Sequence, residues 1–120
     1  MPTADAQRVL VVEDEALIAM ELEDMLGDLG HEVVDTVGSL KRGLELLGEL
    51  RPLPDIAIVD ANLGGESSKP LVEALRELGI PVVIASGYGP GELERLGFDH
   101  QVISKPYSPR DIAAVLSRTN

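Results

Sequence analysis

The sequence predicts an α/β fold with a five-stranded, doubly wound parallel sheet and helices on both faces. Short runs of β-branched residues alternate with leucine-periodic stretches along the 120 residues, a pattern typical of a parallel sheet with crossover helices. Such crossovers are right-handed, which leaves few topologies, and the strand order 2-1-3-4-5 is the favoured one. The length fits one domain, and no repeat or linker divides residues 1–120.

The composition excludes several classes of protein. An apolar content of 44% indicates a globular chain, and a net charge of −11 leaves no basic surface for nucleic acid or anionic lipid. The absence of cysteine excludes disulfides and thiolate chemistry. No apolar run is long enough to span a membrane and no signal peptide is recognisable, so we expect a cytoplasmic protein with no membrane or direct nucleic-acid partner.

The first half of the chain alternates between strand and helix. Residues 8–12 are continuously apolar, which is typical of a strand buried on both faces. Residues 15–29 have one apolar helical face that ends before Gly30, a residue suited to the left-handed turn after a helix. A second strand is predicted at 32–37, and Ser39 caps the helix that follows. The apolar positions of this helix are Leu40, Leu44 and Leu47.

The second half continues the alternation. The predicted elements are a strand at 55–60, a loop at 61–65, a helix at about 68–78, and strands at 80–85 and 101–104. Glycines and prolines after the strand at 80–85 leave room only for a short or irregular fourth helix. The last helix opens at Ser108 with a cap, followed by a proline at its first position.

Polar residues stand at the strand ends, where doubly wound sheets bind their ligands. Glu13 and Asp14 end the first strand and Asp60 ends the third, while Ser86 follows the fourth and Lys105 the fifth. The first and third strands flank the point where the winding direction reverses. We therefore expect the three carboxylates to converge in one crevice.

The expected crevice suits phosphoryl chemistry. Three carboxylates repel one another unless a cation compensates them, and Mg²⁺ together with the Lys105 ammonium supplies that compensation. A phosphoryl group is the ligand that these cations and the Ser86 hydroxyl would bind. Asp60 lies in the middle and is placed to attack phosphorus. Each residue alone also has a structural explanation as a turn or surface residue, and it is their combination that favours function.

These residues give the chain a resemblance to the receiver domains of two-component response regulators, over essentially its whole length. The matching residues are Glu13-Asp14, Asp60, Asn62, Ser86 and Lys105-Pro106. The resemblance implies a single receiver domain of the flavodoxin-like fold over residues 1–120. It also implies that Asp60 accepts a phosphoryl group from a histidine kinase or a histidine phosphotransfer protein.

The resemblance further implies a ligand set for Mg²⁺. Asp14, Asp60 and the backbone carbonyl of Asn62 would bind the ion, and Glu13 would assist through water. Lys105 would bind the phosphoryl group, and Ser86 would move toward it.

A narrower resemblance concerns residues 84–89, Ile-Ala-Ser-Gly-Tyr-Gly. They are similar to the Phe-Ala-Thr-Gly-Tyr-Gly motif of mainly alphaproteobacterial, often stand-alone receivers, whose partners include HWE-type kinases. Val102 stands where receivers usually have an aromatic switch residue. Tyr88 is therefore a candidate replacement in a switch with Ser86, and the alternative is that Tyr88 only packs at the surface.

We expect a signalling module rather than a turnover enzyme, with at most self-phosphorylation from small donors and slow self-dephosphorylation. Its role could be that of an output regulator, a phosphorelay intermediate or a phosphate sink. One alternative is a degenerate receiver that binds partners without phosphorylation. A haloacid-dehalogenase-type phosphohydrolase is disfavoured because Ala16 stands where that chemistry needs a second Asp. A flavodoxin-like carrier is disfavoured because Glu13-Asp14-Glu15 would repel the FMN phosphate.

The negative charge is unevenly placed. Nine acidic residues and no Lys or Arg lie between Arg8 and Lys41, several of them on the first predicted helix. A solvated helix face that keeps the protein in solution explains this distribution. The alternative is a surface that steers a basic partner, such as a kinase docking on this helix.

Overall fold

The computed structural model describes residues 6–87, 95, 97, 101–105 and 107–119. The main sheet of this part of the chain has five strands, which are β1 (Arg8–Val12), β2 (Glu32–Val37), β3 (Ile56–Asp60), β6 (Val82–Ser86) and β7 (Gln101–Ser104). Their order is β2-β1-β3-β6-β7, and each neighbouring pair is parallel. The predicted order 2-1-3-4-5 is confirmed, with β6 and β7 as its fourth and fifth strands.

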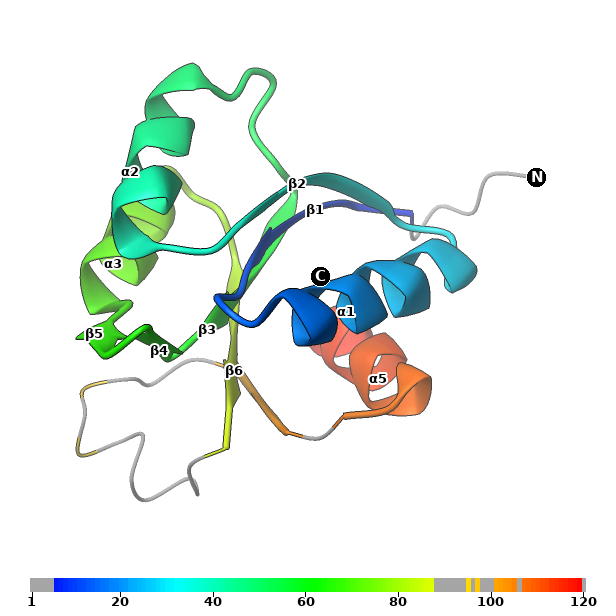
Figure 1. The fold of residues 1–120 in the computed structure, drawn as a ribbon. Coiled ribbons are helices and arrows are strands. Elements are labelled where there is room, and N and C mark those ends of the chain that lie inside the picture. The colour runs from blue at the N-terminus through cyan, green and yellow to red at the C-terminus, as the bar shows by residue number, and fades with distance from the viewer. Residues whose placement is uncertain (1–5, 88–94, 96, 98–100, 106, 120) are drawn as a thin grey trace.

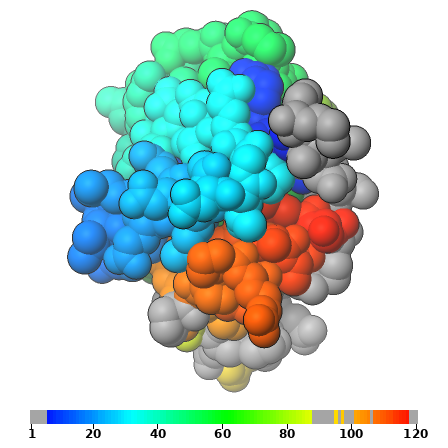
Figure 2. Space-filling model, turned by 90° about the vertical axis from the view of Figure 1, so that its right-hand side faces the viewer, coloured from blue at the N-terminus to red at the C-terminus, as the bar shows by residue number. Residues whose placement is uncertain are grey.

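Helices cover both faces of the sheet (Figure 1). The helices are α1 (Ala16–Asp28), α2 (Leu40–Glu49), α3 (Lys69–Glu77) and α5 (Pro109–Thr119). Helices α2 and α3 lie on one face, and α1 and α5 lie on the other. Figure 2 looks onto the second face, where α1 and α5 are in contact and the edge strand β2 reaches the surface. The predicted fourth helix falls in 88–100, which lies outside the described residues apart from positions 95 and 97.

Alternate side chains of the central strands enter two separate core layers. Leu10 and Val12 of β1 pack toward α2 and α3, whereas Val9 and Val11 pack toward α1 and α5. All four are at most 1% exposed. The continuous apolar run therefore reflects burial on both faces, as the sequence predicts.

Helix α2 begins at its predicted cap, and its buried residues are Gly43, Leu46 and Leu47. The Ser39 hydroxyl accepts a hydrogen bond from the Arg42 amide at 3.1 Å, which confirms the cap. Of the apolar positions of this helix, Leu47 is buried, whereas the Leu44 side chain is 40% exposed. Gly43 faces α3 at close range, since a Cβ built on Gly43 would lie 2.7 Å from Leu71 Cδ2.

The prediction of a loop at 61–65 is corrected by the structure, because most of this segment belongs to a small hairpin. Two-residue strands β4 (Asn62–Leu63) and β5 (Glu66–Ser67) pair antiparallel. Gly64 and Gly65 form the turn with φ of 59° and 94°, a backbone conformation that favours glycine at both positions. The hairpin lies directly after β3 and beside its carboxyl end (Figure 1).

Within the part of the chain that the structure describes, no helix combines the length and the apolar character needed to cross a bilayer.

Candidate functional site

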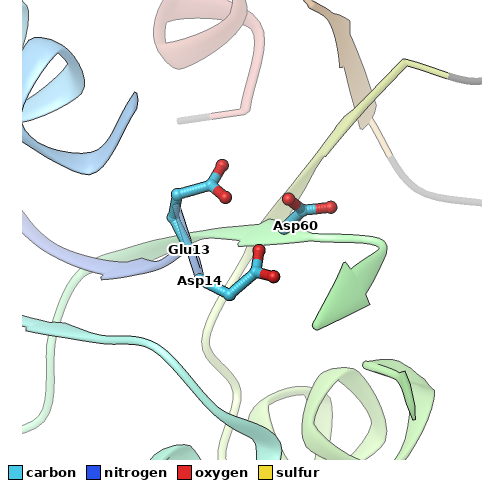
Figure 3. A group of neighbouring side chains, drawn as sticks. All are labelled: Glu13, Asp14 and Asp60. Atoms are coloured by element: carbon cyan, nitrogen blue, oxygen red, sulfur yellow. The ribbon is translucent and has the colours of Figure 1, made fainter. Parts of the chain in front are cut away.

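Three carboxylates meet at the carboxyl end of the sheet. Figure 3 shows Glu13 and Asp14 beyond the end of β1 and Asp60 at the end of β3, with their carboxylates facing a common space. One oxygen from each residue lies within 4.8 Å of the others. Parallel pairing of Val12 with Val59 aligns the two strand ends. The convergence expected from the sequence is therefore present.

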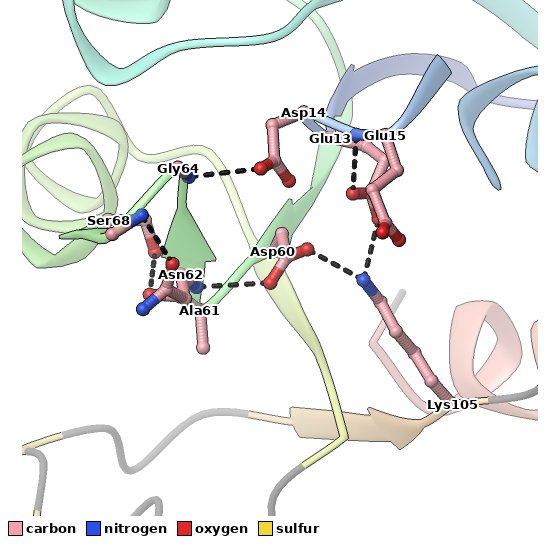
Figure 4. Close-up of polar contacts among 10 residues, drawn as sticks. Glu13, Asp14, Glu15, Asp60, Ala61, Asn62, Gly64, Ser68 and Lys105 are labelled. Carbon is pink, nitrogen blue, oxygen red and sulfur yellow. Dashed lines mark hydrogen bonds and ion pairs between the residues drawn. The ribbon is translucent and has the colours of Figure 1, made fainter. Parts of the chain in front are cut away.

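Lys105 joins two of these carboxylates. Its Nζ lies 2.8 Å from Glu13 Oε1 and 2.6 Å from Asp60 Oδ2 (Figure 4). The Lys105 backbone amide donates to the carbonyl of Ser86 at 2.8 Å, so the end of β6 fixes the start of the lysine side chain. The ammonium thus reaches from the end of the edge strand β7 to two of the three acids.

The hairpin holds one oxygen each of Asp60 and Asp14. The Asn62 amide donates to Asp60 Oδ1 at 3.0 Å, and the Gly64 amide donates to Asp14 Oδ2 at 3.0 Å. The side-chain oxygen of Asn62 accepts a further bond from the Gly65 amide at 2.8 Å. Backbone donors of one hairpin therefore orient two of the three acids. Sequence reasoning missed this role, although the paired glycines are the signal of such a turn.

Ser68 anchors the hairpin to β3, a second role that sequence reasoning missed. Its side chain is fully buried, and its hydroxyl and its amide both donate to the Ala61 carbonyl, at 3.2 and 3.1 Å (Figure 4). The Ser68 carbonyl accepts from the amides of Leu71 and Val72 at the start of α3. The segment after Asp60 is thereby fixed at both ends.

Burial controls the electrostatics of the site. The Glu13 side chain is only 2% exposed, and this burial raises its pKa to about 7, although hydrogen bonds from Lys105 and the Glu15 amide oppose the rise. Burial lowers the pKa of Lys105, but its hydrogen bonds to Asp60 and Glu13 outweigh that effect, and the pKa lies above its ordinary value. Lys105 therefore remains a cation throughout the neutral pH range.

The donor set suits a hard divalent cation. Carboxylate oxygens are the ligands that Mg²⁺ prefers, and Mg²⁺ is commonly held by one or two carboxylates plus water. Asp14 is exposed and open to an incoming ion, while Glu13 and Asp60 are buried beside it. The residues present therefore fit a magnesium site, with Glu13, Asp14 and Asp60 as candidate ligands.

The predicted switch residues lie at different depths. Ser86 ends β6 and is 2% exposed. Val102 of β7 is half-buried and packs against the core layer under α2 and α3. Tyr88 lies outside the described residues.

Tyr107 is a further residue beside the site. Its hydroxyl is buried and is, among the described residues, the buried side-chain polar atom without a hydrogen-bond partner. Burial raises the pKa of Tyr107 to about 12, and the Glu13 charge adds to this rise. A cavity of about 370 Å³ is lined by Ile18, Glu21, Met25, Lys105 and Tyr107.

Comparison with known families and proteins identifies relatives of this chain. The family model for the response regulator receiver domain matches residues 9–117. The chain is 31% identical to the phyllosphere-induced regulator PhyR of Methylorubrum extorquens, over 94% of this chain and 43% of the relative. It is 32% identical to the transcriptional regulatory protein PdtaR of Mycobacterium tuberculosis, over 92% of this chain and 58% of the relative. It thus spans about half the length of these two relatives.

Solved structures show the same fold. The solution structure of SdrG from Sphingomonas melonis is 37% identical, with a TM-score of 0.80 over 96% of this chain and 97% of that chain. The crystal structure of the response regulator PhyR from Brucella abortus is 31% identical, with a TM-score of 0.81 over 95% of this chain and 47% of that chain. The anti-anti-sigma factor PhyR from Bartonella quintana is 28% identical, with a TM-score of 0.81 over 95% of this chain and 47% of that chain.

Proposed function

This chain belongs to the response regulator receiver domain family, and we propose that Asp60 is its phosphoacceptor, phosphorylated by a histidine kinase or a histidine phosphotransfer protein. The supporting observation is the Asp60 carboxylate, held between a lysine ammonium and two further carboxylates at the carboxyl end of the sheet. We also propose that residues 1–120 form one receiver domain. The motif at 84–89 makes HWE-type kinases candidate donors for it.

The transfer follows from the groups around Asp60. One Asp60 oxygen attacks phosphorus while the P–N bond to the donor imidazole breaks, and the imidazole keeps the electron pair. The product is an acyl phosphate on Asp60. The Asn62 amide holds Oδ1 and Lys105 holds Oδ2, so the carboxylate is oriented before the donor arrives.

Other residues stabilise the transferred group. A magnesium ion held by Asp14, Asp60 and the Asn62 carbonyl, with Glu13 acting through water, would neutralise charge on the phosphoryl oxygens. Lys105 turns from the carboxylates to a phosphoryl oxygen, and the Ser86 hydroxyl donates to another.

The phosphorylated state would then change how the domain binds partners. One PhyR relative is an anti-anti-sigma factor, which makes regulated binding of a protein partner one candidate output for this chain. A relay intermediate and a phosphate sink are the others. The switch would involve Ser86 and Tyr88 in place of an aromatic residue at Val102. An unchanged NMR signal of Tyr88 on phosphorylation would exclude its part in the switch.

The test is intact-mass spectrometry after incubation with acetyl phosphate or a histidine kinase, with and without Mg²⁺. We expect one phosphoryl adduct that depends on Mg²⁺ and is absent in Asp60→Asn. The matched control is Asp24→Asn, which removes an exposed carboxylate from α1 and should keep the adduct. No adduct with competent donors would favour the degenerate receiver, and steady phosphate release would favour the phosphohydrolase.

A further inference from the structure

The buried Tyr107 hydroxyl has no hydrogen-bond partner among the described residues. Such groups are rare in folded proteins, because a buried donor without an acceptor loses its hydration and gains nothing in return. The residue sits two positions after Lys105 and lines the same cavity as the lysine side chain. A partner for this hydroxyl is therefore to be sought among the groups near Lys105.

Glu13 is a buried acceptor that would lose a donor when Asp60 is phosphorylated. Its carboxylate is almost completely buried and accepts two bonds, from Lys105 Nζ at 2.8 Å and from the Glu15 amide at 3.1 Å. Under the proposed function, Lys105 turns toward the phosphoryl group. Glu13 Oε1 would then lose its only side-chain donor among the described residues while it stays in a buried site.

We propose that Tyr107 is a positioning residue that donates its phenolic hydrogen to Glu13 when Lys105 turns to the phosphoryl group. The inference rests on the proposed function of Asp60. The Tyr107 hydroxyl is without a partner before phosphorylation, Glu13 Oε1 loses its lysine donor on phosphorylation, and both side chains lie beside Lys105. A hydrogen bond between them satisfies both in the phosphorylated state.

The chemistry of the pair is suitable. A carboxyl oxygen of Glu13 can accept a hydrogen bond whether or not the group is ionised, and a phenol with a pKa of about 12 keeps its hydrogen at neutral pH. Among the charges that act on Tyr107, that of Glu13 has the largest effect. The cavity lined by Lys105 and Tyr107 gives the lysine stem and the tyrosine ring room to move relative to each other.

The spectroscopic test uses the two tyrosines of the chain. Protein labelled with ¹³C at tyrosine Cζ is titrated with Mg²⁺ and beryllofluoride, which imitates the phosphoryl group on Asp60. The signal that disappears in Tyr107→Phe identifies Tyr107. We expect this signal to move on beryllofluoride binding as its hydroxyl gains a carboxylate acceptor, and to stay in place in Asp60→Asn. A Tyr107 signal that does not move when beryllofluoride binds overturns the inference.

The affinity test compares variants of the same cavity. We expect Tyr107→Phe to bind beryllofluoride roughly tenfold more weakly than the wild type, because a buried Glu13 oxygen is then left without a donor in the bound state. Its unfolding midpoint without Mg²⁺ should match or exceed that of the wild type, because the hydroxyl has no partner there. Met25→Leu changes the cavity lining without touching a hydroxyl and should keep the wild-type affinity.

The outcomes separate the two hypotheses. A Tyr107→Phe protein that binds beryllofluoride as tightly as the wild type overturns the role of Tyr107 and leaves the phosphoacceptor intact. A wild-type protein that neither binds beryllofluoride nor takes a phosphoryl group overturns the proposed function, and the role of Tyr107 fails with it.

Discussion

Glu13 is an acid whose burial has a measurable effect on the folded state. Its pKa of about 7 in the folded protein lies above the ordinary value of 4.5, so the folded state binds the proton more tightly than the unfolded state. The corresponding stability is fully present below pH 4.5 and is lost as pH rises through 7. The full effect is on the order of 3 kcal/mol.

The prediction is a difference in pH dependence between two proteins. In EDTA, the free energy of unfolding of the wild type should fall between about pH 5 and 8 relative to that of Glu13→Gln, which has no carboxyl to ionise. Urea unfolding at several pH values measures both. Parallel pH profiles for the two proteins would show that Glu13 ionises normally.

Lys105 serves as the cation of the acidic cluster when no metal is bound. We expect Lys105→Met to lower the free energy of unfolding in EDTA by about 1–3 kcal/mol, because the carboxylates of Glu13 and Asp60 lose their positive partner. Mg²⁺ should stabilise this variant more than it stabilises the wild type, because the ion then replaces the missing charge. Lys41→Met, on the exposed face of α2, is the control and should change neither value. Equal stabilisation by Mg²⁺ in all three proteins contradicts the prediction.

At the scale of elements, the contact of α2 with α3 depends on one glycine. A Cβ at Gly43 would lie 2.7 Å from Leu71 Cδ2, whereas a Cβ at Gly48 of the same helix meets nothing within 4 Å. We expect Gly43→Ala to destabilise the fold by about 1 kcal/mol, because overpacking against Leu71 outweighs the gain in helix propensity. Gly48→Ala should stabilise it by about 0.5 kcal/mol through helix propensity. Thermal unfolding of the pair tests this, and equal effects would mean that Leu71 moves aside freely.

The same helix shows how far the sequence predicts these elements. The strands were predictable because their buried runs are apolar and β-branched, and the Ser39 cap was predictable because it is local. The leucine spacing of α2 does not show that Leu44 is exposed, because it does not contain the close packing of Gly43 on Leu71. The two-residue strands β4 and β5 were missed because they are too short to show a period.

The candidate site also has features that the sequence predicts and features that it does not. Residues at strand ends were predictable because parallel strands place their carboxyl ends together, and the acids do converge. The bond from the Gly64 amide to Asp14 spans 50 residues and depends on a turn conformation, so sequence patterns do not contain it. The unpartnered hydroxyl of Tyr107 depends likewise on packing around the finished fold.

At the scale of the whole molecule, the net charge of −11 opposes compaction. Salt screens this repulsion, so we expect the unfolding temperature to rise by a few degrees as NaCl increases from low to physiological concentration. Asp24→Lys on α1 should raise the low-salt unfolding temperature, because no Lys or Arg lies between Arg8 and Lys41. Glu49→Lys makes the same charge change but loses the 2.9 Å contact with Arg42, and it should give no such gain. Differential scanning calorimetry at two salt concentrations distinguishes the two variants.

The ion pair between Lys105 and Glu13 joins residues that lie 92 positions apart. Under the proposed function, the phosphate-accepting centre would therefore not exist in a chain that has only begun to fold, or in one still emerging from the ribosome without its last strand. A donor that phosphorylates Asp60 only in this environment would label folded molecules alone. Phosphate incorporation would thus count the native fraction of a population, and misfolded copies would drop out of the signalling pool without any separate checkpoint.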